Sequence, residues 1–361
     1  MEVLDQSGTQ RVVRRSSRRV WTGVVGWLEH HETQLWWLHS LWALAFGIGV
    51  MWLGSRNIAY LRIALVHVSF IWVTSMALPF IVRSGTLSKT WRTRAQLVIN
   101  YFNKNFYQQL LFFILPVYWL STTPGSPNVL FVVLLATAAL LSTMDLVYDR
   151  HVAMRRVLTA LFFAFSVFAA AAAALPILWQ IESVTALWLA AVVASAGATT
   201  LVISERRIDW QRTWFAGGLI VLGLFVIVEY GRSFIPPAPL RLANATFGTE
   251  VDLTNGPRIG RVVQVTPTDP RGQVYVVTAI YAPSGLHDRV RHVWYRGAQQ
   301  VKRSRFYDVD FGRTGGYRLW SPLSLSGDLA GQALRVDVET EGGQLIGRAY
   351  LPAAPALTPG P

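Results

Sequence analysis

Residues 214–240 contain the boundary that most constrains how this chain can fold. Residues 214–228 are almost wholly apolar, and Glu229, Arg232 and a run of prolines end the stretch abruptly. Upstream, every long segment is apolar enough for a bilayer, and downstream none is. The sequence therefore predicts a membrane domain followed by a domain in water.

The prolines define how the two parts are joined. Proline fixes its own φ and disfavours helix in the residue before it, so Pro236, Pro237 and Pro239 predict a stiff, extended spacer at residues 232–241. The spacer separates a membrane domain at 36–231 from a soluble domain at 242–352.

Composition supports a membrane protein. Charged residues make up 15% of the 361-residue chain, whereas a soluble domain typically has about 25%. The net charge of +13 is most simply a topology signal, and no motif of a nucleic-acid-binding module accompanies it. Cysteine is absent, which excludes disulfides, thiolate chemistry and cysteine metal sites.

Seven segments are candidate spans, since a helical span needs about 20 mostly apolar residues. We expect them at residues 36–54, 58–82, 106–121, 128–144, 157–179, 184–204 and 214–229. The sequence thus predicts an α-helical polytopic membrane bundle of about seven spans. Residues 1–35 precede it and contain arginines at three- and four-residue spacing, typical of a basic amphipathic segment on the membrane surface. The favoured interpretation is a plain cytoplasmic anchor, because the preference of positive charge for the cytoplasmic side already accounts for the arginines.

Basic residues lie in alternate loops. They occur in the N-terminal segment and in the loops after the second, fourth and sixth candidate spans, including Lys89, Arg155 and Arg206. Positive charge favours the cytoplasmic side. We therefore expect the bacterial inner membrane, with a cytoplasmic N-terminus and a periplasmic C-terminal domain.

The C-terminal domain shows a different pattern. Apolar and polar residues alternate from residue 242 onward, and glycine- or proline-containing turns separate the alternating runs. Seven strands are expected, at residues 260–266, 274–282, 289–296, 305–311, 317–321, 333–340 and 345–351. This predicts an all-β antiparallel sandwich, with residues 353–361 as a tail.

One candidate ligand site lies in this domain. His292 and Trp294 share one strand face, and Arg318, Trp320 and Ser321 lie in a later strand. Together they could form an aromatic surface edged by hydrogen-bond donors, which suits glycans and peptides. The alternative is that both tryptophans are core residues of a small sandwich.

Two polar features lie within the predicted membrane domain. Asn100, Asn105 and Gln108 cluster at the start of the third candidate span, and His67 lies deep in the second. Polar residues at membrane depth are costly and often functional, so a cavity or transport path is one interpretation. Ordinary hydrogen bonds between helices are the other.

No enzyme signature is present. The chain has no phosphate-binding glycine loop, no His-Glu-x-x-His motif and no Gly-x-Ser-x-Gly elbow, and no metal site or cofactor is indicated. A membrane enzyme acting on lipid or cell-wall precursors is therefore the weakest of the functional hypotheses.

Four C-terminal motifs point to a known domain. They are Val274-Tyr-Val-Val-Thr-Ala-Ile, His292-Val-Trp-Tyr, Gly316-Tyr-Arg-Leu-Trp-Ser and Gly343-Gln-Leu-Ile-Gly-Arg. In order and spacing they resemble the bacterial domain of unknown function 2914. The chain departs from that pattern at Ala333-Leu334, where a tryptophan would be expected.

Two motifs in the membrane part, Lys104-Asn-Phe-Tyr-Gln-Gln and Leu115-Pro-Val-Tyr-Trp, are similar to the uncharacterised family 5924. Both resemblances imply a bacterial envelope protein and supply no activity.

The leading functional hypothesis is a non-enzymatic inner-membrane protein. Its periplasmic sandwich would bind an envelope partner or ligand, with glycan as the candidate. The alternative is a transporter or channel that uses the polar residues of the third span and His67. The partners expected are the lipid bilayer and an envelope glycan or protein, with no nucleic acid. The sequence implies no oligomeric state.

Overall fold

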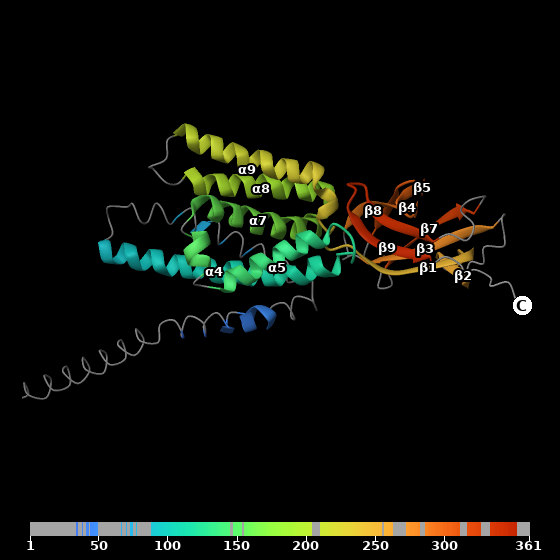
Figure 1. Cartoon of the computed structure of the whole chain (residues 1–361), viewed down its shortest axis with the longest axis horizontal. Coiled ribbons are helices and arrows are strands. Elements are labelled where there is room, and N and C mark those ends of the chain that lie inside the picture. The colour runs from blue at the N-terminus through green and yellow to red at the C-terminus, as the bar shows by residue number, and fades with distance from the viewer. Residues whose placement is uncertain are drawn as a thin grey trace, which may run out of the picture.

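The computed structural model describes most of the chain from residue 88 to 351. Gaps occur at 145–146, 154, 204–209, 255, 263–271, 282–285, 311–315 and 326–332, and a few positions between 34 and 77 are also described. In Figure 1 the helices lie side by side, and the β domain extends beyond one end of them. The basic segment at 1–35, the first two candidate spans and the tail lie largely or wholly outside the described residues.

The helical part contains five long helices in the described residues. They are α4 (Lys89–Leu120), α5 (Val129–Thr143), α7 (Arg156–Trp179), α8 (Ser183–Ile203) and α9 (Trp210–Tyr230), with a short π-helix, η2 (Tyr148–Ala153). The last four agree closely with the expected apolar segments. Helix α4 begins well before the expected residue 106, at the N-cap Ser88, whose side chain accepts the Trp91 N–H.

The prediction of about seven spans is wrong for the described part of the chain. Only two helices there, Val157–Trp179 and Ser183–Thr200, are long and apolar enough to cross a membrane. Val129–Thr143 and Gly217–Tyr230 are apolar but shorter. The N-terminal part of α4 contains Lys89, Arg92 and Arg94, which make that part unsuited to hydrocarbon.

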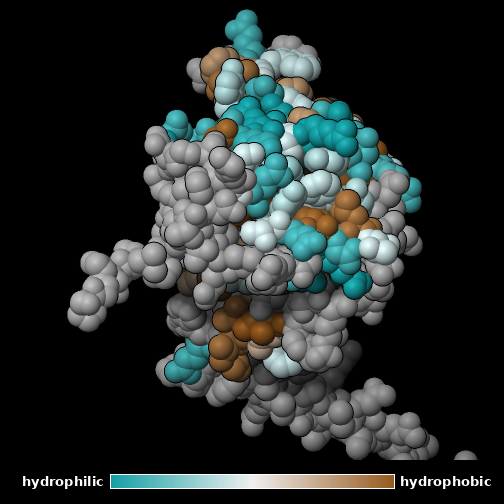
Figure 2. Space-filling view, turned by 90° about the vertical axis from the view of Figure 1, so that its right-hand side faces the viewer, coloured by the Kyte–Doolittle hydropathy of each residue, from teal (hydrophilic) through white to brown (hydrophobic). Residues whose placement is uncertain are grey.

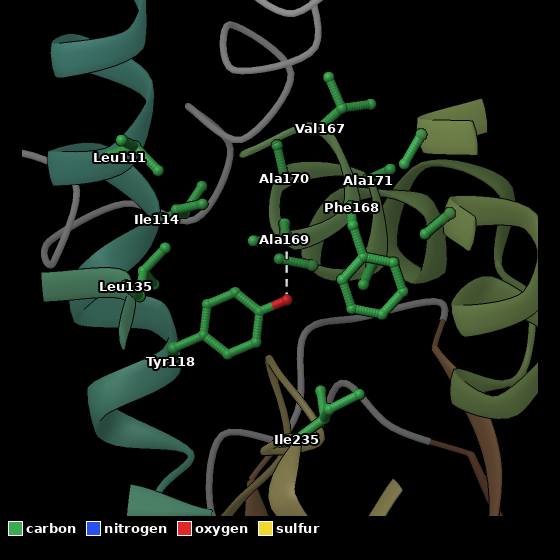
Figure 3. Close-up of a cluster of buried hydrophobic side chains, with 14 of the residues drawn as sticks. Leu111, Ile114, Tyr118, Leu135, Val167, Phe168, Ala169, Ala170, Ala171 and Ile235 are labelled. Carbon is green, nitrogen blue, oxygen red and sulfur yellow. Dashed lines mark hydrogen bonds between the residues drawn. The ribbon is translucent and has the colours of Figure 1, made fainter. Parts of the chain in front are cut away.

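Helix α7 forms the centre of the helical core. Its alanines from Ala169 to Ala174 are buried and let neighbouring helices approach closely. Tyr118 from α4 reaches across to α7 and donates its hydroxyl to the Ala169 carbonyl at 2.8 Å, as Figure 3 shows. Ile235, from the segment after α9, joins the same cluster.

The proline-rich segment differs from the extended spacer that was expected. After a 3-10 turn, η3 (Arg232–Phe234), residues 235–240 are all buried. Ala238 N–H donates to Pro236 O, and Leu240 N–H donates to Pro237 O, so the segment folds into turns. Ile235 and Ala238 pack in the helical core and Leu240 in the β core, so the segment joins two cores directly.

Two antiparallel sheets form the C-terminal domain, which confirms the β part of the predicted fold. The first has the order β2-β1-β3-β7, with β1 (Arg241–Asp252), β2 (Arg258–Val262), β3 (Gln273–Tyr281) and β7 (Tyr317–Ser324). The second has the order β5-β4-β8-β9, with β6 also paired to β4. Its strands are β4 (His287–Arg296), β5 (Gln299–Arg303), β6 (Tyr307–Asp310), β8 (Leu334–Thr340) and β9 (Leu345–Leu351).

Side chains from both sheets fill the space between them. One apolar cluster contains Ile280, Val290, Leu319 and Val338, and a second contains Val276, Trp294, Leu323 and Val336. The inward residues alternate with outward ones along β3, β4 and β7. This alternation decides which predicted site residues lie inside the domain and which lie on its surface.

Candidate functional site

The structure divides the predicted ligand-binding set between two sides of the first sheet. Ser321 points into the sandwich, while Arg318 and Trp320 occupy the opposite, outer face of β7. His292 and Trp294, from the second sheet, are completely buried. The single exposed surface expected from all five residues is therefore not formed.

The buried residues form a hydrogen-bonded chain that links the two sheets. Trp294 Nε1–H donates to Ser321 Oγ at 2.9 Å, and Ser321 Oγ lies 2.8 Å from His292 Nδ1. On the other side of the ring, His292 Nε2 lies 2.8 Å from Thr278 Oγ1, whose hydroxyl donates to Leu319 O. A neutral imidazole with its proton on Nε2 gives every one of these donors an acceptor.

Burial fixes that protonation state. It lowers the pKa of His292 to about 3, because no carboxylate offsets the loss of water around the imidazolium. The histidine is thus neutral at ordinary pH and fully engaged in bonds between the sheets. This arrangement is a polar centre of the core, and it stabilises the pairing of the two sheets.

The outer face of the first sheet carries the remaining aromatic residues. Strand pairing places Thr246, Val277 and Trp320 in one row, and Gly248, Tyr275 and Pro322 in the next. The Tyr275 and Trp320 rings lie 6.0 Å apart at 45°. We call this surface, with Tyr281, the aromatic face.

Arginines lie at the end of the aromatic face nearest the helices. The Arg241 guanidinium lies over the Tyr281 ring, 4.6 Å from its centroid. Arg318 is in the neighbouring row, beside Ala279 and Asn244. All the aromatic and arginine side chains of this face are partly exposed.

Tyr275 and Tyr281 were missing from the predicted set. Their signal was present in the sequence, since they alternate with buried residues along the same strand. The two-residue period of a strand also predicts that Arg318 and Trp320 lie on the face opposite to Ser321.

The β domain is fastened to the helices by polar contacts. Asp288, at the start of β4, is buried against the N-terminus of α8, where its Oδ2 accepts the Ser183 hydroxyl at 2.5 Å and the Ser183 N–H at 3.4 Å. Its Oδ1 accepts the N–H of Arg289 at 2.9 Å. Burial raises the pKa of Asp288, although these hydrogen bonds oppose the change.

The β8–β9 hairpin makes further contacts with the helical part. Gln344 Nε2 donates to Ile235 O at 3.0 Å, and Asn128, the residue before α5, donates to Leu345 O at 3.4 Å. Gly342 lies so close to Val184 that an added Cβ would be 2.2 Å from its Cγ2. We call these contacts, with Asp288–Ser183, the docking interface.

The helices expose much apolar surface. Large hydrophobic side chains on α5, α7, α8 and α9 remain exposed, among them Val133, Leu161, Val192 and Leu222. Soluble monomers rarely expose continuous apolar surface on this scale. By contrast, the described surface seen from the β-domain end is mostly hydrophilic, with smaller hydrophobic groups between (Figure 2).

Three aromatic residues mark the helix ends next to the β domain. Trp119 in α4, Trp179 in α7 and Tyr230 in α9 are 64%, 65% and 81% exposed. Each is the last or next-to-last residue of its helix. Exposed Trp and Tyr at such positions are typical of a membrane–water interface.

The predicted membrane polar cluster is only partly described. Asn105 is half-buried and Gln108 is buried, and both side chains have interaction partners. Asn100 belongs to α4, with its side chain outside the described residues, as is the whole of His67. In the described part of the chain, no group of three His, Asp or Glu residues could hold a metal ion.

Two family models match most of the chain, and the boundary between the two matches lies within the β domain, at β3. The model of the family of unknown function DUF5924 matches residues 18–273, and that of the protein of unknown function DUF2914 matches residues 287–350. Both resemblances inferred from the sequence, and their order, are confirmed. No curated protein matches the chain.

Proposed function

The chain belongs to the DUF5924 family, and from its geometry we propose that it is a membrane-anchored, non-enzymatic binding protein of the bacterial envelope. Its helical part, with α7, α8 and α9 crossing in turn, would hold the β domain at the outer surface of the inner membrane. The aromatic face of the β domain would bind an envelope glycan.

The membrane placement is supported by exposure and charge. Apolar side chains cover the outside of the helices, and Trp119, Trp179 and Tyr230 lie at the ends next to the β domain. Arg155 and Arg156 are at the opposite end of α7. Because positive charge favours the cytoplasm, this distribution supports a periplasmic β domain.

The observation that carries the binding proposal is the aromatic face itself. Tyr275 and Trp320 are partly exposed side by side on the outer face of the first sheet, with polar Thr246 and Asn244 on the neighbouring strand β1. Aromatic rings cover the apolar faces of sugar rings, and adjacent polar groups fix their orientation. The buried polar centre around His292 supports the sheet behind this face.

Topology is tested by cysteine labelling, for which the absence of native cysteine is convenient. Ser324→Cys lies exposed at the end of β7, and Thr90→Cys lies exposed near the start of α4. We expect a membrane-impermeant maleimide to label Ser324→Cys once the outer membrane is opened, and Thr90→Cys only after lysis. The reverse pattern would contradict a periplasmic β domain.

Binding is tested with the full chain in nanodiscs of zwitterionic lipid. Soluble oligosaccharides should bind the native chain, and Trp320→Ala should abolish that binding. The matched control is Tyr350→Ala, which removes an exposed aromatic residue from β9 in the other sheet. Equal binding by both variants would contradict the proposed face.

A further inference from the structure

Several arginines of the second sheet are neutralised by carboxylates of the chain, whereas Arg296 and Arg303 bond to glutamines. On the second sheet, Arg291 pairs with Glu339 at 3.1 Å, and Arg348 binds both oxygens of Asp337, at 2.8 and 3.0 Å. Arg335 Nε lies 3.1 Å from the same aspartate. These arginines are occupied by the protein's own carboxylates.

The aromatic face has no such compensation. Its strand segments at 241–246, 275–281 and 318–322 contain no Asp or Glu. Among the described residues, no carboxylate lies within ion-pair distance of Arg241 or Arg318, and the Arg241 guanidinium rests only on Tyr281. A partner that brings its own negative charge would complete this surface.

We propose that the aromatic face is selective for acidic saccharides, with Arg318 and Arg241 binding the carboxylate or phosphate of a sugar that stacks on Trp320 and Tyr275. This inference rests on the proposed function and adds the ligand's charge to it. Guanidinium groups pair with carboxylate or phosphate in a two-pronged geometry, which a neutral sugar cannot offer. Arg318 lies one row and Arg241 two rows from Trp320 along the sheet, so one oligosaccharide can reach both kinds of group.

The test measures binding of two soluble probes to the full chain in zwitterionic nanodiscs. The acidic probe is an oligogalacturonate and the neutral probe is maltohexaose. We expect the acidic probe to bind more tightly, and its affinity to fall as sodium chloride is added. Arg318→Gln should weaken the acidic probe by about tenfold or more and leave the neutral probe unchanged.

Arg303→Gln is the matched control. It removes the same charge from an exposed arginine of β5, on the other sheet, whose guanidinium donates to Gln300 Oε1. Both variants should unfold at the same temperature as the native chain, since neither breaks an ion pair. Equal weakening by Arg303→Gln and Arg318→Gln would overturn the assignment to this face.

The outcomes separate the two proposals. If maltohexaose binds as tightly as oligogalacturonate and Trp320→Ala abolishes both, the charge inference fails while the proposed glycan-binding function stands. If neither probe binds, or Trp320→Ala changes nothing, both proposals fail.

Discussion

The carboxylate of Asp288 caps helix α8 at Ser183, although the two residues belong to different domains and are 105 positions apart in the chain. A carboxylate at a helix N-terminus satisfies free N–H groups and meets the positive end of the helix dipole. The cap of a helix in the helical part is thus supplied by the β domain. Folding of one domain is thereby linked to folding of the other.

Asp288→Ala should destabilise the full chain by about 1–2 kcal/mol, because the Ser183 N–H and hydroxyl lose their acceptor. Thermal unfolding of the detergent-purified protein, followed by tryptophan fluorescence, measures the change. Asp308→Ala is the control, since its ion pair with Arg289 is exposed and should contribute little. Equal destabilisation by the two variants would contradict a buried cap.

Asp288 also gives a pH dependence with a defined sign. Its pKa is raised in the fold, so the folded state holds the proton more tightly than the unfolded state does. Its contribution to stability is full below the ordinary value of 3.8 and is lost as pH rises through the raised pKa. The native protein should therefore lose its advantage in unfolding temperature over Asp288→Ala as pH rises from 4 through the raised pKa of Asp288.

The contact between Gly342 and Val184 predicts a pair of compensating substitutions. Gly342→Ala should destabilise the protein by about 1–3 kcal/mol, because the new Cβ would overlap the stiff Val184 side chain. Val184→Ala removes the overlapping methyl group, so the double variant should lose less stability than the two single losses added together. If the loss in the double variant equals the sum of the two single losses, residue 342 and Val184 are not in steric contact.

His292 predicts an acid-labile fold. The folded state keeps this side chain neutral down to about pH 3, whereas the unfolded state takes up a proton near 6.5. The free energy of unfolding should therefore fall as pH drops below 6.5, by about 1.4 kcal/mol per pH unit from this group. His292→Gln should be less stable at pH 7 and should lack this part of the slope. A variant with the native slope would show that another group is responsible.

Truncation of the two tryptophans should cost very different amounts of stability. Trp294→Ala removes a fully buried ring and the Ser321 hydrogen bond, and should cost about 3–5 kcal/mol. Trp320→Ala should cost far less, because the ring is partly exposed on the outer face. Unfolding temperatures of the two variants check the difference. A larger loss for Trp320→Ala would reverse the assignment of inside and outside.

Alternation in the sequence predicted most of the β domain, and its failures have physical causes. Strand β1 was missed because its register shifts between Leu242 and Asn244 and again near Gly248, which breaks the two-residue period. Strand β5 is Gln-Gln-Val-Lys-Arg, a polar edge strand with little apolar signal. In the described part of the chain the number of spans was overestimated for two reasons. The apolar parts Val129–Thr143 and Gly217–Tyr230 are too short, and α4 is long but carries Lys89, Arg92 and Arg94 near its start.

For the candidate site, periodicity showed which residues share one face of a strand, but it did not show which residues of the two sheets are in contact. It placed His292 and Trp294 on one face correctly. It could not show that this face meets Thr278 and Ser321 across the core, since that depends on how the two sheets stack. The docking interface was also beyond sequence reasoning, because Asp288 and Gln344 look like ordinary turn residues until the helices are placed beside them.

The burial of residues 235–240 sets a limit on where this protein can act. A module on a loose tether explores a hemisphere around its anchor, and it can bend toward whatever lies nearby. Here the segment that would serve as a tether is part of two packed cores, so the aromatic face keeps one height and one tilt relative to α9. Under the proposed function, a glycan would have to enter that layer above the membrane in order to bind, so binding would depend on the distance of the glycan from the membrane as well as on its chemistry.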